Sequence, residues 1–251
     1  MAPSRRRRSS PATGSARNSA IGQLLTPAEW QAVWLTLDVS ARATLFGLPV
    51  AVALAFVLAR FHFPGRALLD AAAHLPLVLP PVVVGWLLLL LFGLHGPAGA
   101  LLHSWFGVRL VFTEGGAVLA CAVMIFPLML RTIRLSVEAV DPGLEQAART
   151  LGAGAWDRFF TITLPLAAPG VLVGAIVGFA ASLGEFGAVI TFAANIPGET
   201  QTLPLAIYSA LQAPGGETAA ARLSLVSVAL AVAFLVAAEA AGKRLRARVG
   251  R

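Results

Sequence analysis

The residues whose types and spacing most suggest a function lie in a polar stretch between two long apolar runs. The stretch reads Gln146-Ala147-Ala148-Arg149-Thr150-Leu151-Gly152, and Ile162-Thr163-Leu164-Pro165 follows it. The alanine pair permits close approach by a partner surface, and Gly152 allows a sharp change of chain direction without a Cβ clash. Pro165 is expected to stop a short helix before the next apolar run. The stretch is typical of a docking element, because the surrounding loop is basic and carries Arg131, Arg134, Arg149 and Arg158.

The composition of the whole chain indicates what must position this element. Hydrophobic residues make up 57% of the chain and charged residues only 12%, against about a quarter in soluble domains. The mean hydropathy of +0.79 argues against a soluble all-α protein with a large core. Charged residues are absent from five long runs, namely 43–59, 71–102, 115–130, 159–184 and 223–238.

These runs predict a polytopic helical membrane protein of the all-α class. A helix needs about 20 apolar residues to cross the hydrocarbon core, and only helices or closed barrels satisfy every backbone group in lipid. The runs lack the alternating pattern of barrel strands. Five crossings are predicted, at about Leu37–Arg60, His74–Leu94, Gly115–Leu130, Leu166–Gly184 and Leu223–Ala241. Two shorter apolar pieces, 186–196 and 203–213, suit re-entrant or incomplete helices and leave a sixth crossing open.

The cations predict how the chain is oriented and divided. Residues 1–25 read as a disordered basic tail, and residues 26–251 as one membrane domain. Placing the segments 60–66, 131–165 and 243–251 in the cytoplasm follows the positive-inside rule. The amino terminus is then periplasmic and the carboxyl terminus cytoplasmic, although Arg5 to Arg8 contradict this assignment. The net charge of +7 comes from cations that cluster at the ends of the apolar runs, where they orient a membrane protein. No nucleic-acid partner is therefore expected.

The 146–165 stretch resembles the signature loop of ABC-importer permeases. That pattern is Glu-Ala-Ala, three residues, Gly, nine residues, Ile, one residue and Leu-Pro. This chain keeps the spacing but has Gln146 in place of the acid, with Glu145 one position earlier. Contact geometry, rather than a charge pair at position 146, must then carry the coupling. The ATPase-coupling loop is predicted at 131–165, with Glu145, Gln146, Ala147, Ala148, Gly152, Ile162, Leu164 and Pro165 as its site residues.

Further segments narrow the resemblance to the molybdate permeases and extend it over nearly the whole chain after residue 25. These segments are 63–65, 75–85, 145–152, 182–188 and 195–204. The Gly184-Glu185-Phe186-Gly187 element is shared with sulfate and tungstate permeases, so it indicates only the oxyanion group. The Ile196–Thr202 run looks most like the molybdate branch. Molybdate is therefore the expected substrate, with tungstate or sulfate as the alternative.

The resemblance implies a type I importer permease in the inner membrane. It implies a homodimer, two copies of a cytoplasmic ABC ATPase and an extracytoplasmic molybdate-binding protein. ATP and Mg would be bound by the ATPase, so no cofactor, metal or catalytic residue is expected in this chain. The Gly-rich piece Gly93–Gly99 also lacks the Gly-Lys-Ser/Thr ending that cradles a nucleotide. An ion-coupled secondary transporter is a weaker alternative, because ionisable groups inside the membrane are nearly absent.

Candidate residues for the pathway or gate lie in two regions. The first is Pro80-Pro81-x-x-x-Gly85, which reads equally as a hinge lining the pathway or as a packing kink without a gating role. The second region supplies Ser182, Glu185, Phe186, Gly187, Thr191, Thr200 and Thr202. Because Glu185 would repel an anion, a gate or a structural hydrogen bond is favoured for it over ligation.

Overall fold

The computed structural model describes residues 25–249, with side chains through residue 237. The predicted basic tail lies outside the described residues, apart from Leu25. The side chains of the carboxyl-terminal cations from Lys243 onward also lie outside them.

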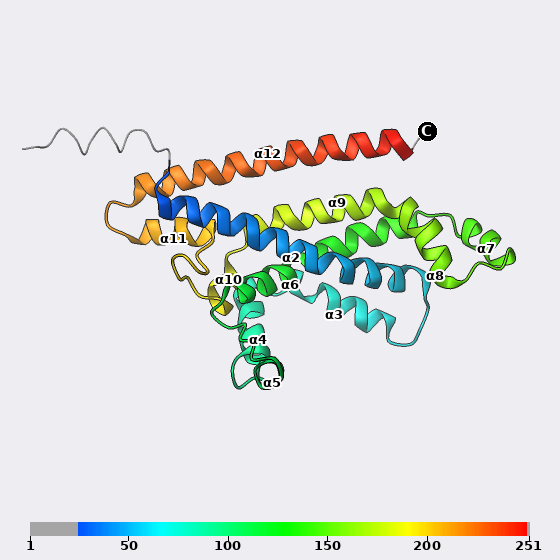
Figure 1. Cartoon of the computed structure of the whole chain (residues 1–251), viewed down its shortest axis with the longest axis horizontal. Coiled ribbons are helices and arrows are strands. Elements are labelled where there is room, and N and C mark those ends of the chain that lie inside the picture. Colours follow the sequence, from blue (N-terminus) through cyan, green and yellow to red (C-terminus); the bar gives the residue numbers. More distant parts are fainter. Residues whose placement is uncertain (1–24, 250–251) are drawn as a thin grey trace, which may run out of the picture.

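The described part of the chain consists of helices joined by loops and contains no strand, which confirms the predicted all-α class. Four long helices (α2, α6, α9 and α12) run along the long axis of the molecule (Figure 1). Of the shorter ones, α7 and α8 lie at one end and α11 at the other, α3 lies beside the bundle, and α4 and α5 project from it. In chain order the elements are α2 (Pro27–Arg60), α3 (Arg66–Val78), α4 (Pro81–Phe92), α5 (Pro97–Phe106), α6 (Glu114–Glu138), α7 (Pro142–Thr150), α8 (Ala155–Arg158), the π-helical turn η1 (Phe159–Thr163), α9 (Leu164–Leu183), α10 (Gly187–Phe192), α11 (Leu203–Gln212) and α12 (Glu217–Val249).

Helix α2 begins at a capping box. The Glu29 amide donates to Thr26 Oγ1 at 3.3 Å, and the Thr26 amide donates to Glu29 Oε2 at 2.7 Å. The sequence Thr26-Pro27-Ala28-Glu29 predicts this start, because proline suits the first helical position. The Glu29 carboxylate also pairs with Arg222 near the beginning of α12. The cap of α2 is thereby fastened to the first turns of the last helix.

Among residues 25–249, four helices are long and apolar enough to cross a membrane: α2, α6, the continuous helix Ala155–Leu183, and α12. The predicted second crossing, His74–Leu94, covers the end of α3 and all of α4, and these two helices meet at a bend of 118°. Pro80 and Pro81 account for the break, since neither can donate a backbone hydrogen bond. Counting the bent pair as one span gives the five crossings predicted. Helices α10 and α11, with 6 and 10 residues, are too short to add a sixth alone.

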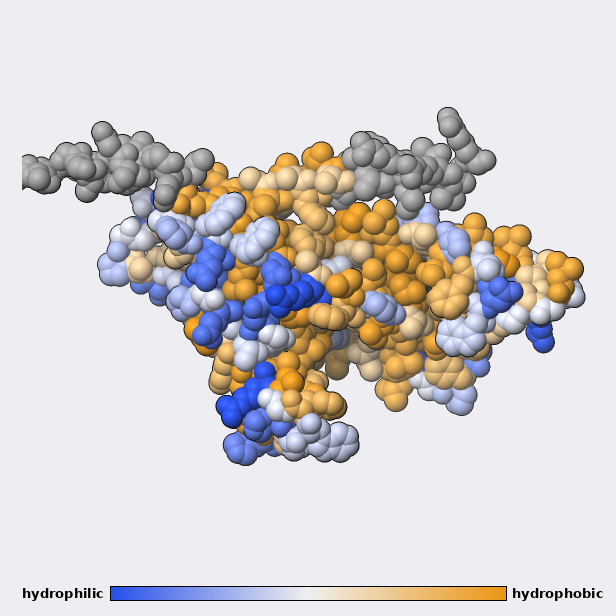
Figure 2. Space-filling model, in the orientation of Figure 1, coloured by the Kyte–Doolittle hydropathy of each residue, from blue (hydrophilic) through white to orange (hydrophobic). Residues whose placement is uncertain are grey.

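The centre of the bundle is formed by α2, α6 and α9. Helix α9 turns a row of small residues toward α6, so that a Cβ on Gly174 would lie 2.8 Å from Ile133 Cγ1 and one on Gly178 would lie 2.6 Å from Met129 Cγ. Small residues at this spacing let two helix backbones approach closely in a membrane. Figure 2 shows apolar residues over the middle of this face, with hydrophilic residues gathered toward its ends.

The expectation that Pro165 stops a short helix is wrong. The chain is helical from Ala155 to Leu183, and Pro165 lies in the first turn of α9. The turn η1 directly precedes it, and there the Leu164 amide donates to the carbonyl of Phe159, five residues earlier. Such a widened turn changes the hydrogen-bonding pattern where proline could not have contributed a donor. Helix α6 likewise continues to Glu138, past the predicted end at Leu130.

Candidate functional site

The predicted coupling loop forms one end of the molecule. Helices α7 and α8 project beyond the long helices there (Figure 1). Helix α7 is capped by the Asp141 side chain, which accepts from the Gly143 amide at 2.8 Å, and none of its residues is buried. Gly152, with φ of 88°, turns the chain between α7 and α8. This is the left-handed conformation that glycine adopts at little cost.

Glu145 points inward and anchors the loop to α2. Arg60 Nε donates to Glu145 Oε1 at 3.0 Å, and Thr163 Oγ1 donates to the same oxygen at 2.7 Å. A second nitrogen of Arg60, Nη2, donates to the carbonyl of Val140 at 3.0 Å. Thr163 is fully buried, and the side chains of Arg60 and Glu145 are only 14% and 19% exposed. This node joins the end of α2, the loop and η1.

The other motif residues divide between the surface and the packed side of the loop. Ala147 and Pro165 are exposed, whereas Ala148, Ile162 and Leu164 are half-buried. Gln146 is exposed and lines a cleft of about 360 Å³ between the end of α2, α7 and α8. Arg60, Arg149 and Arg158 also line this cleft. Adjacent residues of the motif therefore have different surroundings, with Glu145 bound internally and Gln146 left free.

The outer surface of this end is apolar as well as basic. Leu151 is 89% exposed and Trp156 is 76% exposed, and Leu144 and Phe160 are also exposed. Within residues 25–237, Arg149 and Arg158 form no ion pair. Exposed apolar groups of this size, rimmed by polar residues, are typical of protein-interaction surfaces. This end of the chain has the character of a surface that another protein covers.

The candidate residues Thr200 and Thr202 lie at the opposite end and are buried. The Ile196 amide donates to Thr200 Oγ1 at 3.0 Å, and that hydroxyl donates to the carbonyl of Ala194 at 3.3 Å. Ala194 has φ of 65°, an uncommon value for a residue with a Cβ. Thr200 therefore holds a tight loop together from inside, and in this conformation it does not face an open passage.

Gly85 and Gly187 allow α4 and α10 to lie in close contact. A Cβ on Gly85 would be 2.7 Å from Thr191 Cβ, and one on Gly187 would be 2.7 Å from Pro81 Cβ. The Thr191 hydroxyl is occupied within α10, where it donates to the Gly187 carbonyl at 2.8 Å. These contacts support the packing interpretation of the Pro80–Gly85 segment.

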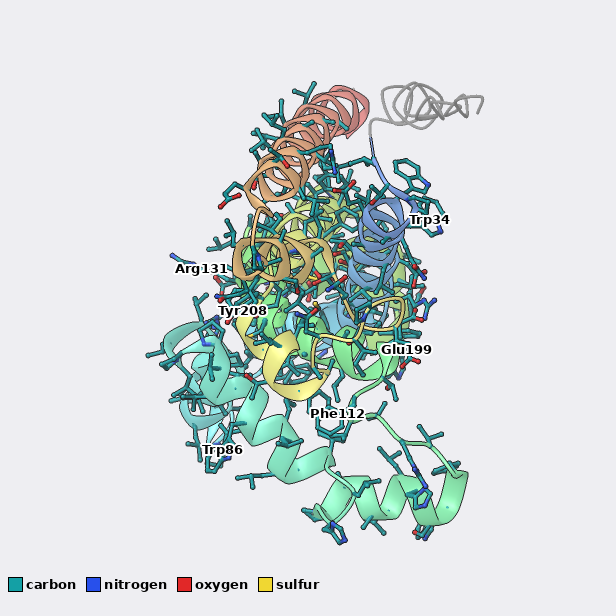
Figure 3. All side chains as sticks on the ribbon, turned by 90° about the vertical axis from the view of Figure 1, so that its left-hand side faces the viewer. Trp34, Trp86, Phe112, Arg131, Glu199 and Tyr208 are labelled. Carbon is teal, nitrogen blue, oxygen red and sulfur yellow. The ribbon has the colours of Figure 1, made fainter. Side chains whose placement is uncertain are left out.

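The remaining candidates lie at the end of α9 and in the link from α9 to α10. Glu185 accepts from the Ala188 amide at 3.0 Å, which agrees with a structural hydrogen bond. The Phe186 ring lies 5.2 Å from that of Tyr208, a residue whose ring reaches the surface at the α11 end (Figure 3). Ser182 is buried, and its hydroxyl has no hydrogen-bond partner within the described part of the chain.

Sequence reasoning missed two clusters of ion pairs on α2, one near the middle of the helix and one at its carboxyl-terminal end. Arg42 pairs with Asp38 at 2.6 Å and with Glu114 at 2.7 Å, although span-end charges are expected simply to reach into water. The i,i+4 spacing of Asp38 and Arg42 could have indicated the first pair. Nothing in the sequence indicates that Arg60 binds Glu145. Arg42 and Arg60 lie about 27 Å apart along the helix at 1.5 Å per residue, close to the thickness of the hydrocarbon core.

The chain is similar to curated transport proteins over almost its whole length. It is 58% identical over 228 residues to the molybdenum transport system permease protein ModB of Escherichia coli (strain K12), covering 91% of this chain and 100% of that protein. It is 53% identical over 222 residues to ModB of Haemophilus influenzae, covering 88% and 97%. A sulfate transport system permease protein, CysT of Escherichia coli, is 38% identical over 194 residues, covering 77% of this chain and 69% of CysT.

Solved structures of ABC transporters share the fold. A bacterial ABC transporter that imports alginate matches with a TM-score of 0.71 at 19% identity, covering 93% of this chain and 85% of that one. The MetNI methionine ABC transporter matches with a TM-score of 0.62 at 17% identity, covering 88% and 96%. The family described as "Binding-protein-dependent transport system inner membrane component" matches residues 47–247. The chain is therefore a multi-pass membrane protein with the ABC-importer permease fold, and it belongs to this family of binding-protein-dependent inner-membrane transport components.

Proposed function

We propose that this chain is the permease subunit of an ATP-driven importer that carries molybdate across the inner membrane. The observation that carries the proposal is the 58% identity to a molybdenum transport permease along that protein's entire length. The identity to a sulfate permease is lower and covers less of that protein, so sulfate is the second candidate.

Uptake measurements test the proposed substrate and the energy source. The chain would be produced together with its cognate binding protein and ATPase and reconstituted in vesicles. Uptake of labelled molybdate is expected to require ATP inside the vesicle and to survive dissipation of ion gradients. Excess unlabelled molybdate should abolish uptake of the label, and excess sulfate should leave it nearly unchanged. Uptake driven by an ion gradient without ATP would instead favour a secondary transporter.

The proposal assigns the α7–α8 end to the ATPase and places that end in the cytoplasm. Its support is the exposed Leu151 and Trp156 side chains and the two arginines left without carboxylate partners. Leu151→Glu should prevent co-purification of the ATPase, because a charge would be buried in an apolar contact. Thr218→Glu adds the same charge to an exposed residue at the other end and should leave co-purification intact. Equal co-purification by both variants would refute this docking surface.

A second copy of the chain and an extracytoplasmic binding protein complete the proposed transporter. Helix α4 projects from the bundle (Figure 3) and exposes Trp86 and Val82, which gives a second copy an apolar face to cover. The only cysteine, Cys121, is buried, so Val82→Cys would supply a single accessible thiol. A disulfide-linked dimer is expected from that variant after mild oxidation, and Val228→Cys on exposed α12 serves as the control.

A further inference from the structure

A groove of about 400 Å³ lies between α3 and α6 and takes no part in the function proposed above. It is lined by Asp70, His74, Arg131, Arg134, Leu135 and Glu138. Helix α3 buries none of its residues, so the groove lies on the outer side of the bundle. Leu135 is 61% exposed and supplies an apolar wall.

The groove lies at the depth of lipid headgroups. Counted from Glu114, the first residue of α6, Arg131 and Arg134 lie about 26 and 30 Å along the helix at 1.5 Å per residue. The hydrocarbon core is about 30 Å thick. The groove is therefore at the boundary between the acyl chains and the headgroups, on the side of the membrane that carries the coupling loop.

The charges in the groove are unevenly paired. Arg134 binds both carboxylates, Asp70 through Nη1 at 2.8 Å and Glu138 through Nε at 2.8 Å. Asp70 Oδ1 also lies 3.2 Å from Nδ1 of His74. With His74 neutral, one guanidinium serves two carboxylates, which leaves a negative charge in excess. Arg131 forms no ion pair among residues 25–237, and its side chain lies at the outer edge of the bundle (Figure 3). The groove presents one unpaired cation beside a surplus of carboxylate.

We propose that this groove binds the headgroup of an aminophospholipid. The lipid phosphate pairs with Arg131, the primary ammonium donates to the Glu138 carboxylate, and an acyl chain follows Leu135. A headgroup with both charges neutralises both of the unpaired groups, whereas an anionic headgroup would leave the surplus carboxylate unmatched. Basic sites between membrane helices are known to hold lipid headgroups at this depth. The inference does not depend on which ion the protein transports.

Lipid titration of the purified full-length chain in detergent tests the site. Bound lipid is counted by native mass spectrometry with phosphatidylethanolamine, phosphatidylcholine and phosphatidylglycerol of identical acyl chains. Phosphatidylethanolamine is expected to bind about threefold to fivefold more tightly than the other two, the scale of one or two partly exposed ion pairs. Phosphatidylcholine keeps both charges but has no N–H to donate, and phosphatidylglycerol has no ammonium.

Two variants separate the two contacts. Glu138→Gln should bring phosphatidylethanolamine and phosphatidylcholine to within about twofold of each other, and Arg131→Gln should weaken both by about threefold. Arg131→Lys should retain binding and so report a correctly folded groove. Arg109→Gln and Glu217→Gln change exposed charges at the other end and should have no effect.

Three results would overturn the proposal. Equal binding of the three lipids would remove the headgroup selectivity, and tighter binding of phosphatidylglycerol would indicate an ordinary basic site. If the groove variants instead shift the chain from dimer to monomer without changing lipid binding, a second copy of the chain covers the groove.

Discussion

The two ends of the bundle are stabilised in different ways. At the α10–α11 end, α4 and α10 pack closely through glycine, and Thr200, Asn195 and Gln201 join the 194–202 loop through hydrogen bonds. The buried Thr202 hydroxyl there has no hydrogen-bond partner within the described residues. At the α7–α8 end, α7 buries nothing, and the Arg60–Glu145–Thr163 node is the main polar tie to the bundle. The first end is held by close packing and several hydrogen bonds, whereas the second is held mainly at one attachment point and has an exposed apolar surface.

If the ATPase binds the α7–α8 end as proposed, that end receives the force and the α10–α11 end resists it. A surface attached through a few directional contacts can move as a unit when a partner pulls on it. An end packed through glycine contacts has little room to adjust, since close-packed interiors tolerate little change in volume. The predictions below challenge each kind of attachment in turn.

The largest effect is expected where α4 and α10 touch through glycine. Gly187→Leu would place a side chain where Pro81 Cβ already lies, and it should cost about 3 kcal/mol or more through overpacking. The yield of monodisperse protein and its thermal midpoint measure the loss. Gly184→Leu is the control, because a Cβ there lies 3.9 Å from its nearest neighbour, the Ala181 carbonyl oxygen. Similar losses for both variants would show that close packing is not what holds this end.

The second-largest effect is expected at the Arg60–Glu145–Thr163 node. Arg60→Met leaves Glu145 partly buried without its cation and should lower the free energy of unfolding by about 3 kcal/mol. ATP-dependent uptake by the assembled transporter should fall about tenfold or more, because the loop loses its tie to α2. Arg66→Met, in the next helix, removes a cation with no ion pair in the described region and should leave uptake near normal.

A double-mutant cycle sharpens this test. If Arg60 and Glu145 act through each other, Arg60→Met combined with Glu145→Gln should cost about 1 kcal/mol less than the sum of the two single changes. Strict additivity would mean that the 3.0 Å contact contributes nothing to the attachment.

A smaller effect is expected in the 194–202 loop, which is held by the Thr200 hydroxyl. Thr200→Val keeps the volume but removes the hydroxyl that links the Ile196 amide to the Ala194 carbonyl, and should cost about 1–2 kcal/mol. Limited proteolysis at the 194–202 loop would report the loosening. Thr218→Val, at an exposed position on α12, should leave the cleavage rate unchanged.

The smallest effect is expected from the exposed ion pairs near the middle of α2. Arg42→Gln removes contacts to Asp38 and Glu114 whose side chains are about a third exposed, and should cost about 0.2–1 kcal/mol. The loss should shrink in concentrated salt, whereas that of Arg60→Met should persist. Thermal midpoints in low and high salt distinguish the two, and an equally salt-resistant loss at Arg42 would contradict the ranking.

Features governed by local chemistry could be read from the sequence. The apolar runs, the α2 cap, the turn at Gly152 and the short helices after Gly184 follow from neighbouring residues. The two prolines predict a break between α3 and α4, but the 118° bend depends on how α4 packs against α10, which no local pattern encodes.

The site itself was only partly readable. The motif locates the loop, but the inward direction of Glu145 depends on Arg60, which lies 85 positions away in the chain. The burial of Thr200 likewise reflects a loop closed on itself, whereas its sequence suggests an available hydroxyl. Proline at 165 misleads because the π-helical turn before it lets the helix continue.

The opposite directions of Glu145 and Gln146 have a consequence for how such transporters diversify. Glu145 is constrained by contacts within its own chain, whereas Gln146 is exposed and available for contact with a partner. If the ATPase contacts this end as proposed, substitutions at position 146 can follow changes in the ATPase surface without disturbing the Glu145 anchor one residue away. Exchanging this permease between related complexes should then require rematching the outward face alone, so that new pairings can arise from few substitutions.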